Sequence, residues 1–253
     1  MKHALHAANK KVLVLLLALC QLTVLLCSCD PPRAGQRDSF LMDTLIQQRI
    51  DDADGAEAVL DEAEALLRQL DAALSRFQPE SDVSRISANA GAAPVPVGED
   101  TLAVLRFAKD FSRQSSNALA VTVTPLSDLW NVNAEDPRVP DADAVAAALT
   151  LVDDAQLVLD GDTAFLARPG MSLDLGALGK GYACDRLIQL YRDKGVTAAI
   201  VSVGGSIAAL GRPEGRAYTI GIRDPRGDAS SYIATLPLED AFCSTSGDYE
   251  QYF

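Results

Sequence analysis

The chain has 253 residues, and an export signal predicted over residues 1–28 leaves 225 to fold, enough for one large domain or two small ones. Without the three lysines of that signal, 19 basic and 35 acidic residues remain, and a surface with a formal charge of −16 repels nucleic acid. Both histidines, His3 and His6, lie in the signal, so the mature chain excludes Ser–His–Asp triads and His-ligated zinc or haem unless another chain supplies the imidazole.

The first 30 residues have the pattern of an exported lipoprotein. Lys10 and Lys11 precede an apolar run over residues 12–26, and the small residue Ser28 stands before Cys29. This ending resembles a bacterial lipoprotein box, in which Cys29 becomes the lipidated first residue. An ordinary secretory signal or a single membrane anchor is the alternative. With residues 29–39 as a tether, we expect a lipid-anchored protein of the bacterial cell envelope that faces the periplasm, and Asp30 favours the inner membrane.

The folded part, residues 40–253, mixes strand and helix patterns in an order that predicts an α+β fold with mixed or antiparallel sheets and flanking helices. In chain order we predict a strand (40–50), two helices (51–77, 99–112), a strand (120–124), a helix (141–149), a hairpin (155–159 and 163–167), a strand (171–175), a helix (179–194) and three strands (198–203, 218–223, 232–236).

The helix over residues 51–77 has the clearest pattern. Leucine and alanine recur at helical spacing along one face, with acidic and basic residues on the other. Asp51, Asp52 and Asp54 are predicted to cap its first turn.

Two cysteines remain in the folded part besides Cys29. Cys184 and Cys243 could pair in an oxidising compartment, or both could be buried free thiols, but two are too few for a disulfide framework.

Residues 174–185 read DLGALGKGYACD, which predicts a strand that runs into a Gly-rich turn at the start of a helix. The free N–H groups and positive end of such a helix can hold phosphate, and Lys180 adds a full charge; a tight structural turn is the alternative. Three further segments carry weaker signals. Residues 203–206 could admit a ligand or form a crowded bulge, the hydroxyls of residues 244–246 could bind phosphate or form a turn, and Phe77 could stack on a ring system or be plain core.

Taken in order, these segments resemble the ApbE-like family of FAD:protein FMN transferases. The family's markers are present as MDT (42–44), LSRFQPESDVSRI (74–86), VTVTPL (121–126) with LW (129–130), DLGALGKGYACD (174–185), VGG (203–205) and TSGDY (245–249). The match covers nearly all of residues 40–253.

The resemblance implies an exported, Mg²⁺-dependent enzyme that splits FAD, releases AMP and attaches FMN through a phosphoester to a Ser or Thr of a target protein. By matching position, it implies that one set of residues contacts FAD: Met42 and Phe77 at the flavin, Ala118, Leu119 and Ala120 in the pocket, and Asp174 and Lys180, with Lys180 near phosphate. It also implies that the backbone carbonyl of Ala177 binds the metal, in keeping with the oxygen ligands that Mg²⁺ prefers.

In the family, a His-x-x-Asp-Pro-x-Thr-Gly segment and a helix with metal-binding Asp and Thr follow the stretch that ends here at Phe253. We therefore expect a truncated chain with little transferase activity; a shortened protein completed by a partner is the alternative. A flavin-binding lipoprotein without transferase activity, and a structural or adhesive lipoprotein of the same fold, are the other interpretations of the whole pattern.

Overall fold

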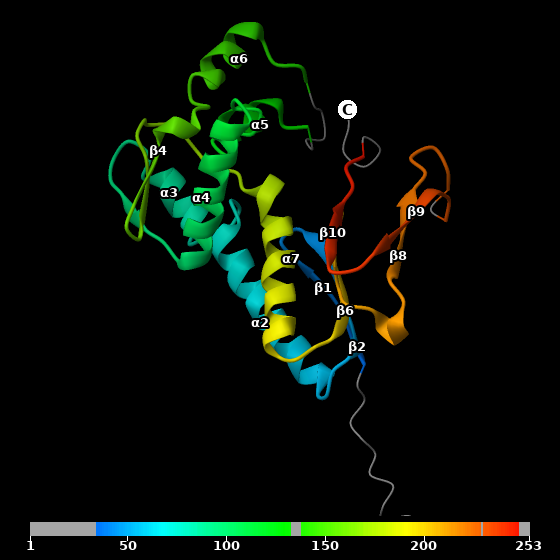
Figure 1. Cartoon of the computed structure of the whole chain (residues 1–253). Helices are drawn as coiled ribbons and strands as arrows, with labels where there is room; N and C mark the ends of the chain where they lie inside the picture. The colour runs from blue at the N-terminus through cyan, green and yellow to red at the C-terminus, as the bar shows by residue number, and fades with distance from the viewer. Residues whose placement is uncertain (1–33, 133–137, 229, 248–253) are drawn as a thin grey trace, which may run out of the picture.

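A five-stranded antiparallel sheet forms the centre of the fold in a computed structural model that describes residues 34–132, 138–228 and 230–247 (Figure 1). Its strand order is β1-β2-β6-β7-β10. A three-stranded sheet has the order β3-β5-β4, and β8 and β9 form a separate hairpin. The strands are β1 (Gly35–Leu41), β2 (Thr44–Asp52), β3 (Val95–Pro96), β4 (Leu157–Asp160), β5 (Thr163–Leu166), β6 (Ala198–Val203), β7 (Ser206–Leu210), β8 (Tyr218–Arg223), β9 (Tyr232–Leu238) and β10 (Ala241–Ser244).

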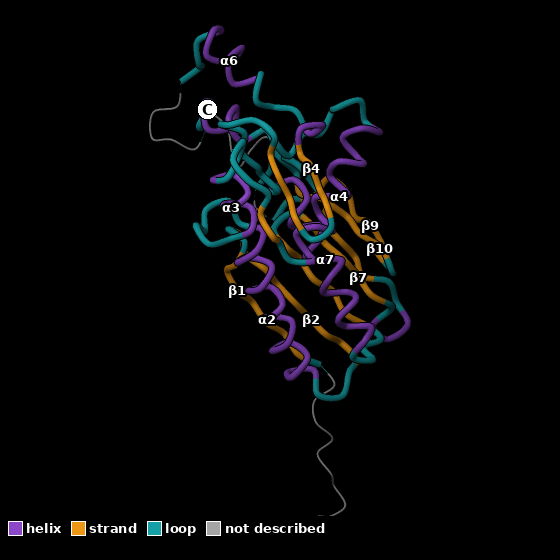
Figure 2. Tube along the Cα trace, turned by 90° about the vertical axis from the view of Figure 1, so that its left-hand side faces the viewer, coloured by secondary structure: helices purple, strands orange, loops and turns teal. Residues whose placement is uncertain are grey.

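Helices cover one face of the central sheet, where α2 and α7 lie side by side across the strands (Figure 2). The helices are α2 (Ala56–Leu74), α3 (Asp82–Ala88), α4 (Glu99–Gln114), α5 (Thr124–Trp130), α6 (Ala142–Leu149) and α7 (Gly176–Asp193), with short 3-10 turns at Asp154–Gln156 and Pro213–Gly215. Within the described ranges, none of these helices combines the length and apolar character needed to cross a bilayer. These elements confirm the predicted α+β class.

The main core lies between the sheet and α2 and α7. Ile46 and Ile50 alternate along β2 toward the helices, and Leu67 and Leu70 of α2 meet them, all four with no exposed surface. Each such side chain contributes roughly 1.5–3 kcal/mol through burial, so the periodic apolar face of α2 is the main reason that this helix docks here. The predicted helical periodicity is thereby confirmed.

The two cysteines lie on opposite faces of the sheet and are free thiols. Cys184 is buried on α7 within the main core, where burial raises the pKa of its thiol to about 12. Cys243 of β10 packs on the other face, against a smaller core formed with the β8–β9 hairpin. The interpretation of two free thiols is confirmed, although Cys243 is only half-buried.

Several predicted elements are confirmed with small shifts at their ends. These are α4, α6, the β4–β5 hairpin around Gly161, and strands β6, β8 and β9. The sequence analysis does not predict helices α3 and α5 or strands β3, β7 and β10.

The predicted strand at residues 40–50 is wrong in one respect, because it is two strands. β1 and β2 meet in a tight hairpin whose turn residues, Met42 and Asp43, have φ values of 54° and 57°. Asp43 is a residue that such turns accept, but Met42 is not and the usual glycine is absent, so the sequence gives only a weak turn signal. β1 begins at Gly35, inside the segment predicted as a tether, whereas residues 1–33, including Cys29 and Asp30, lie outside the described part.

The predicted caps of α2 are also wrong. Asp51 and Asp52 belong to β2, and the N-cap of α2 is Gly55 in a left-handed conformation without a side-chain cap. Asp51 instead accepts a hydrogen bond from the Tyr218 hydroxyl at 2.6 Å, which ties the β8–β9 hairpin to the sheet.

Two further predicted strands, residues 120–124 and 171–175, form no strand. The buried carboxylate of Asp154 accepts from the N–H groups of Val121 and Thr122, both at 3.0 Å, and from the Thr122 hydroxyl at 2.7 Å. A side chain thus satisfies donors that a sheet would otherwise use, and α5 begins at Thr124 with Pro125 in its first turn rather than ending a strand. The two segments touch through a single backbone bond from Asp174 N–H to the Val121 carbonyl, 2.8 Å.

Candidate functional site

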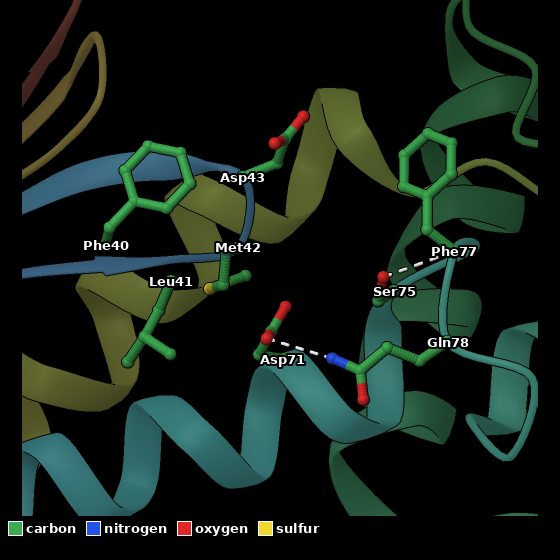
Figure 3. A pocket seen from close by; sticks show the side chains of 8 residues that line it. All are labelled: Phe40, Leu41, Met42, Asp43, Asp71, Ser75, Phe77 and Gln78. Atoms are coloured by element: carbon green, nitrogen blue, oxygen red, sulfur yellow. Dashed lines mark hydrogen bonds between the residues drawn. The ribbon is translucent and has the colours of Figure 1, made fainter.

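A cleft of about 700 Å³ opens where four segments meet: the β1–β2 turn, the end of α2, helix α5 and the start of α7. A smaller pocket of about 430 Å³ adjoins it and shares Met42, Asp43, Asp71, Ser75 and Phe77 (Figure 3). Of the seven residues predicted to bind FAD, the cleft gathers Met42, Phe77, Asp174 and Lys180. Residues more than 130 positions apart in the sequence thus converge on one site.

Met42 is placed by the hairpin turn. Its side chain points into the smaller pocket in Figure 3, and its methyl group would lie 3.6 Å from a Cβ added at Gly179 of α7. That distance is an ordinary van der Waals contact, so the Met42 thioether packs close to the first turns of α7. Met42 therefore forms an adaptable apolar wall between the two cavities.

Phe77 follows the end of α2 and is 72% exposed, so the alternative that it is plain core is wrong. Two hydrogen bonds hold the loop that carries Phe77. The Phe77 N–H donates to the Ser75 hydroxyl at 3.2 Å (Figure 3), and the Ser84 hydroxyl donates to the Arg76 carbonyl at 3.2 Å. The guanidinium of Arg76 lies over the ring, 5.0 Å from its centroid. An exposed aromatic ring on a well-fixed loop is suited to stacking on a ligand.

Asp174 both closes the turn before α7 and lines the cleft, and its contact with FAD stays a prediction. Its Oδ1 accepts from the Gly176 N–H at 2.7 Å, which is the bond of a turn carboxylate, while its side chain also lines the cleft. Its Oδ2 lies 3.5 Å from Nη1 of Arg76. Arg76 in turn forms an ion pair with Asp128 of α5. One guanidinium thus links two carboxylates and an aromatic ring on the cleft wall.

Helix α7 begins at Gly176, three residues earlier than predicted, so Lys180 lies on its second turn. The Lys180 side chain is half-buried there. The N–H groups of Gly176, Leu178 and Gly179 already have acceptors within the chain. The predicted cradle of free N–H groups is therefore mostly occupied, and the full charge of Lys180 is the main feature for an anion at this end of the cleft.

Three predicted pocket residues do not line the cleft. Ala118, Leu119 and Ala120 lie in the loop between α4 and α5, with Ala118 exposed and the other two half-buried. The loop is nevertheless joined to the site through the Val121–Asp174 bond. A contact of these three residues with FAD stays a prediction.

The described residues do not offer a magnesium site. They contain no group of three or more His, Cys, Asp or Glu side chains that could hold a metal ion. Ala177 is the exposed second residue of α7, where a regular helix directs the carbonyl toward the N–H four residues on. One backbone carbonyl supplies little of the oxygen shell that Mg²⁺ requires, so these residues do not fit the ion.

The paired glycines after β6 are explained by the chain itself. Gly204 and Gly205 form the turn between β6 and β7, and Gly204 has a φ of 59°. A Cβ on Gly205 would lie 2.8 Å from the Thr245 carbonyl, and one on Gly204 would lie 2.6 Å from the Thr44 hydroxyl. The structure thus shows a crowded hairpin turn rather than the bulge that was the alternative to a ligand site. Thr245 and Ser246 are exposed beyond β10, and Asp248 and Tyr249 lie outside the described residues.

Sequence reasoning missed Arg76, Asp71 and Asp128, which also line the cleft. Asp71 accepts from the Gln78 amide at 2.9 Å (Figure 3). For Arg76 the one available signal is its place directly before the aromatic Phe77.

The chain is similar to proteins of known name over most of its length. It is 34% identical over 199 residues to a FAD:protein FMN transferase of Klebsiella pneumoniae (78% of this chain, 61% of the relative) and 33% identical over 240 residues to one of Treponema pallidum (87% and 66%). The chain thus spans less than two thirds of the length of these relatives.

Solved structures agree with the sequence relatives. The ApbE protein of Thermotoga maritima superposes with a TM-score of 0.80 at 26% identity, over 87% of this chain and 72% of that one. The flavinyl transferase ApbE of Pseudomonas stutzeri gives 0.77 at 30% identity, over 87% and 70%. The model of the ApbE family matches residues 42–253, which include every residue that lines the cleft. The chain belongs to the ApbE family.

Proposed function

We propose that this protein is a FAD:protein FMN transferase that uses the cleft between the β1–β2 turn and α7. The observation that carries the proposal is the convergence of Met42, Phe77, Asp174 and Lys180 on that cleft. The names of the relatives support it independently.

The reaction is a phosphoryl transfer. The hydroxyl oxygen of a Ser or Thr in an exported acceptor protein attacks the FMN phosphorus, the bond from that phosphorus to the bridging oxygen breaks, and AMP leaves with that oxygen. The proton of the acceptor hydroxyl passes to solvent or to the leaving phosphate. Catalysis of this kind depends mainly on placing the two reactants in line and on stabilising negative charge.

The chain's own residues account for binding and orientation. Phe77 and Met42 form an apolar wall against which the flavin ring lies, as their exposure and position support. Lys180 lies on the side of the cleft formed by the start of α7, where its charge attracts the pyrophosphate.

The charges of the cleft favour Lys180 for that task. The lining contains four carboxylates and two cations: Asp43, Asp71, Asp128 and Asp174, with Arg76 and Lys180. Arg76 is already engaged by two of the carboxylates. Lys180 has no carboxylate within ion-pair distance among the described residues, so its charge is available to a ligand.

The resemblance implies Mg²⁺, whose Lewis acidity would neutralise the pyrophosphate. The described residues do not fit the ion, and the steps above do not depend on it. The requirement for Mg²⁺ therefore remains a proposal that rests on the family alone.

The location of the protein is part of the proposal. Cys29 with its preceding apolar run supports a lipid anchor that holds the cleft on the periplasmic side of the inner membrane. Metabolic labelling with a fatty acid tests it: the chain incorporates label and the Cys29→Ser variant does not. Equal labelling of both would contradict the anchor.

Activity is tested by incubating the purified chain with FAD, MgCl₂ and a cell-envelope extract as the source of acceptor. Release of AMP, together with fluorescent flavin on a protein band in a denaturing gel, supports the transferase. FAD that binds but stays intact favours a flavin-binding lipoprotein without transferase activity, and absence of binding contradicts both.

A further inference from the structure

Arg76 lines the cleft and has three partners in the chain. It forms an ion pair with Asp128 of α5, its Nη1 lies 3.5 Å from Oδ2 of Asp174, and its Cζ lies 5.0 Å from the centroid of Phe77. Its side chain keeps 21% of its surface exposed. The three partners come from separate parts of the chain and are joined in this cleft by the guanidinium.

We propose that Arg76 is a positioning residue for flavin binding: it holds the Phe77 ring and the Asp174 carboxylate in place before the ligand arrives. The proposal rests on the proposed function, because it takes Phe77 as the ring against which the flavin lies. It adds a residue that acts through Phe77 and Asp174 rather than by touching the ligand.

The geometry favours positioning over direct contact with phosphate. The planar guanidinium is engaged on its edge by two carboxylates and faces an aromatic ring, an arrangement to which arginine is suited and lysine is not. A phosphate could be bound by Arg76 only at the expense of those ion pairs. Lys180, by contrast, has no such partner among the described residues, so the two cations of the cleft have different tasks.

Fixing one side chain in advance removes part of the ordering cost of binding. Without Arg76, the Phe77 side chain would lose its rotational freedom only when the ligand binds, and that entropic cost would lower the affinity. Loss of Arg76 should therefore weaken flavin affinity by roughly three- to tenfold. The loss should extend to riboflavin, which has the flavin ring but no phosphate.

The test uses the full chain and two ligands, FAD and riboflavin, titrated by calorimetry and by the shift of the flavin absorption band. Four variants are compared: Arg76→Gln, Arg76→Lys, Lys180→Ala and Arg68→Gln. Arg68 is the matched control, because it pairs with Glu64 on the same helix α2 and is 64% exposed away from the cleft lining. Melting curves confirm that each variant is folded.

For Arg76→Gln we expect weaker binding of both ligands and a smaller absorption shift. Arg76→Lys should bind both ligands about as weakly as Arg76→Gln and show a similarly small absorption shift, because one ammonium group cannot pair with two carboxylates and also cover a ring. Lys180→Ala should weaken FAD alone, and Arg68→Gln neither ligand.

Two results would overturn the inference while leaving the proposed function intact. One concerns riboflavin: the wild-type chain binds FAD, but either it does not bind riboflavin at all or its Arg76→Gln variant keeps the wild-type riboflavin affinity. In both cases the flavin ring would gain no measurable affinity through Arg76. The other is full rescue by lysine, which would make Arg76 a simple charge. A wild-type chain that binds neither ligand would overturn the inference and the proposed function together.

Discussion

Replacement of Asp154 by alanine should destabilise the fold more than any surface change, although Asp154 lies outside the cleft lining. Asp154 is 5% exposed, and its carboxylate accepts three hydrogen bonds, from the N–H groups of Val121 and Thr122 and from the Thr122 hydroxyl. Val121 and Thr122 are themselves 1% and 0% exposed, so water cannot readily replace the lost acceptor.

The magnitude follows from those three donors. A buried donor left unsatisfied costs about 1–3 kcal/mol, so three donors give about 3–9 kcal/mol, of which we expect about 3–5 kcal/mol to remain after the loop has relaxed. For a fold of this size, each kcal/mol lowers the melting temperature by roughly 2–4 °C, which gives a fall of about 6–20 °C.

The assay is thermal unfolding followed by circular dichroism, with urea unfolding to obtain the free energy. Asp110→Ala is the control, since Asp110 forms only a surface pair with Arg113 and is 60% exposed; it should shift the free energy of unfolding by less than about 0.5 kcal/mol. If Asp154→Ala melts within 2 °C of the wild type, the view that Asp154 organises residues 121–124 is refuted.

Two other predictions concern single side chains. Lys180→Ala should weaken FAD binding by about 1.5–3 kcal/mol, the range for a charge-assisted contact, and calorimetry that returns an unchanged affinity would place Lys180 with the solvated surface. Burial raises the pKa of the Cys184 thiol from 9.0 to about 12 in the folded state, so the unfolded chain loses this proton first and the free energy of unfolding should fall between roughly pH 9 and 12. Urea titrations of the wild type and Cys184→Ala should therefore diverge with rising pH in that window, and parallel curves would contradict the buried thiol.

The sequence predicted those parts of the fold whose local pattern agrees with their tertiary role. The periodicity of α2 and the apolar run of β6 were sufficient, because both elements are buried against the core. The start of α7 was misplaced because Gly176 and Gly179 weaken helix propensity, whereas the Asp174 side chain satisfies the first N–H of this helix.

The wrongly predicted strand and the missed turn have different physical origins. The β-branched run at residues 120–124 is typical of a strand, but the carboxylate of Asp154, more than 30 residues away, takes its N–H groups. The turn at Met42 and Asp43 is a local failure: its left-handed backbone is tolerated by Asp but rarely adopted by Met, and the usual glycine is absent.

The candidate site was predictable only in part: the residues alone suggested Lys180 and Phe77, and the family resemblance added Met42 and Asp174. No periodicity relates Met42, Phe77, Asp174 and Lys180, which meet because a hairpin, a helix end and a helix start converge. Arg76 gave no signal beyond its place before Phe77, since its partners Asp128 and Asp174 are 52 and 98 positions away.

The central claim is that flavin binds in the cleft that these segments form, and hydrogen exchange measured by mass spectrometry with and without FAD tests it most directly. We predict slower exchange in peptides that cover the Met42–Asp43 turn, residues 75–77 and residues 174–180, with the β8–β9 hairpin unchanged. Slower exchange confined to that hairpin, or no change anywhere in the presence of saturating FAD, would contradict the claim.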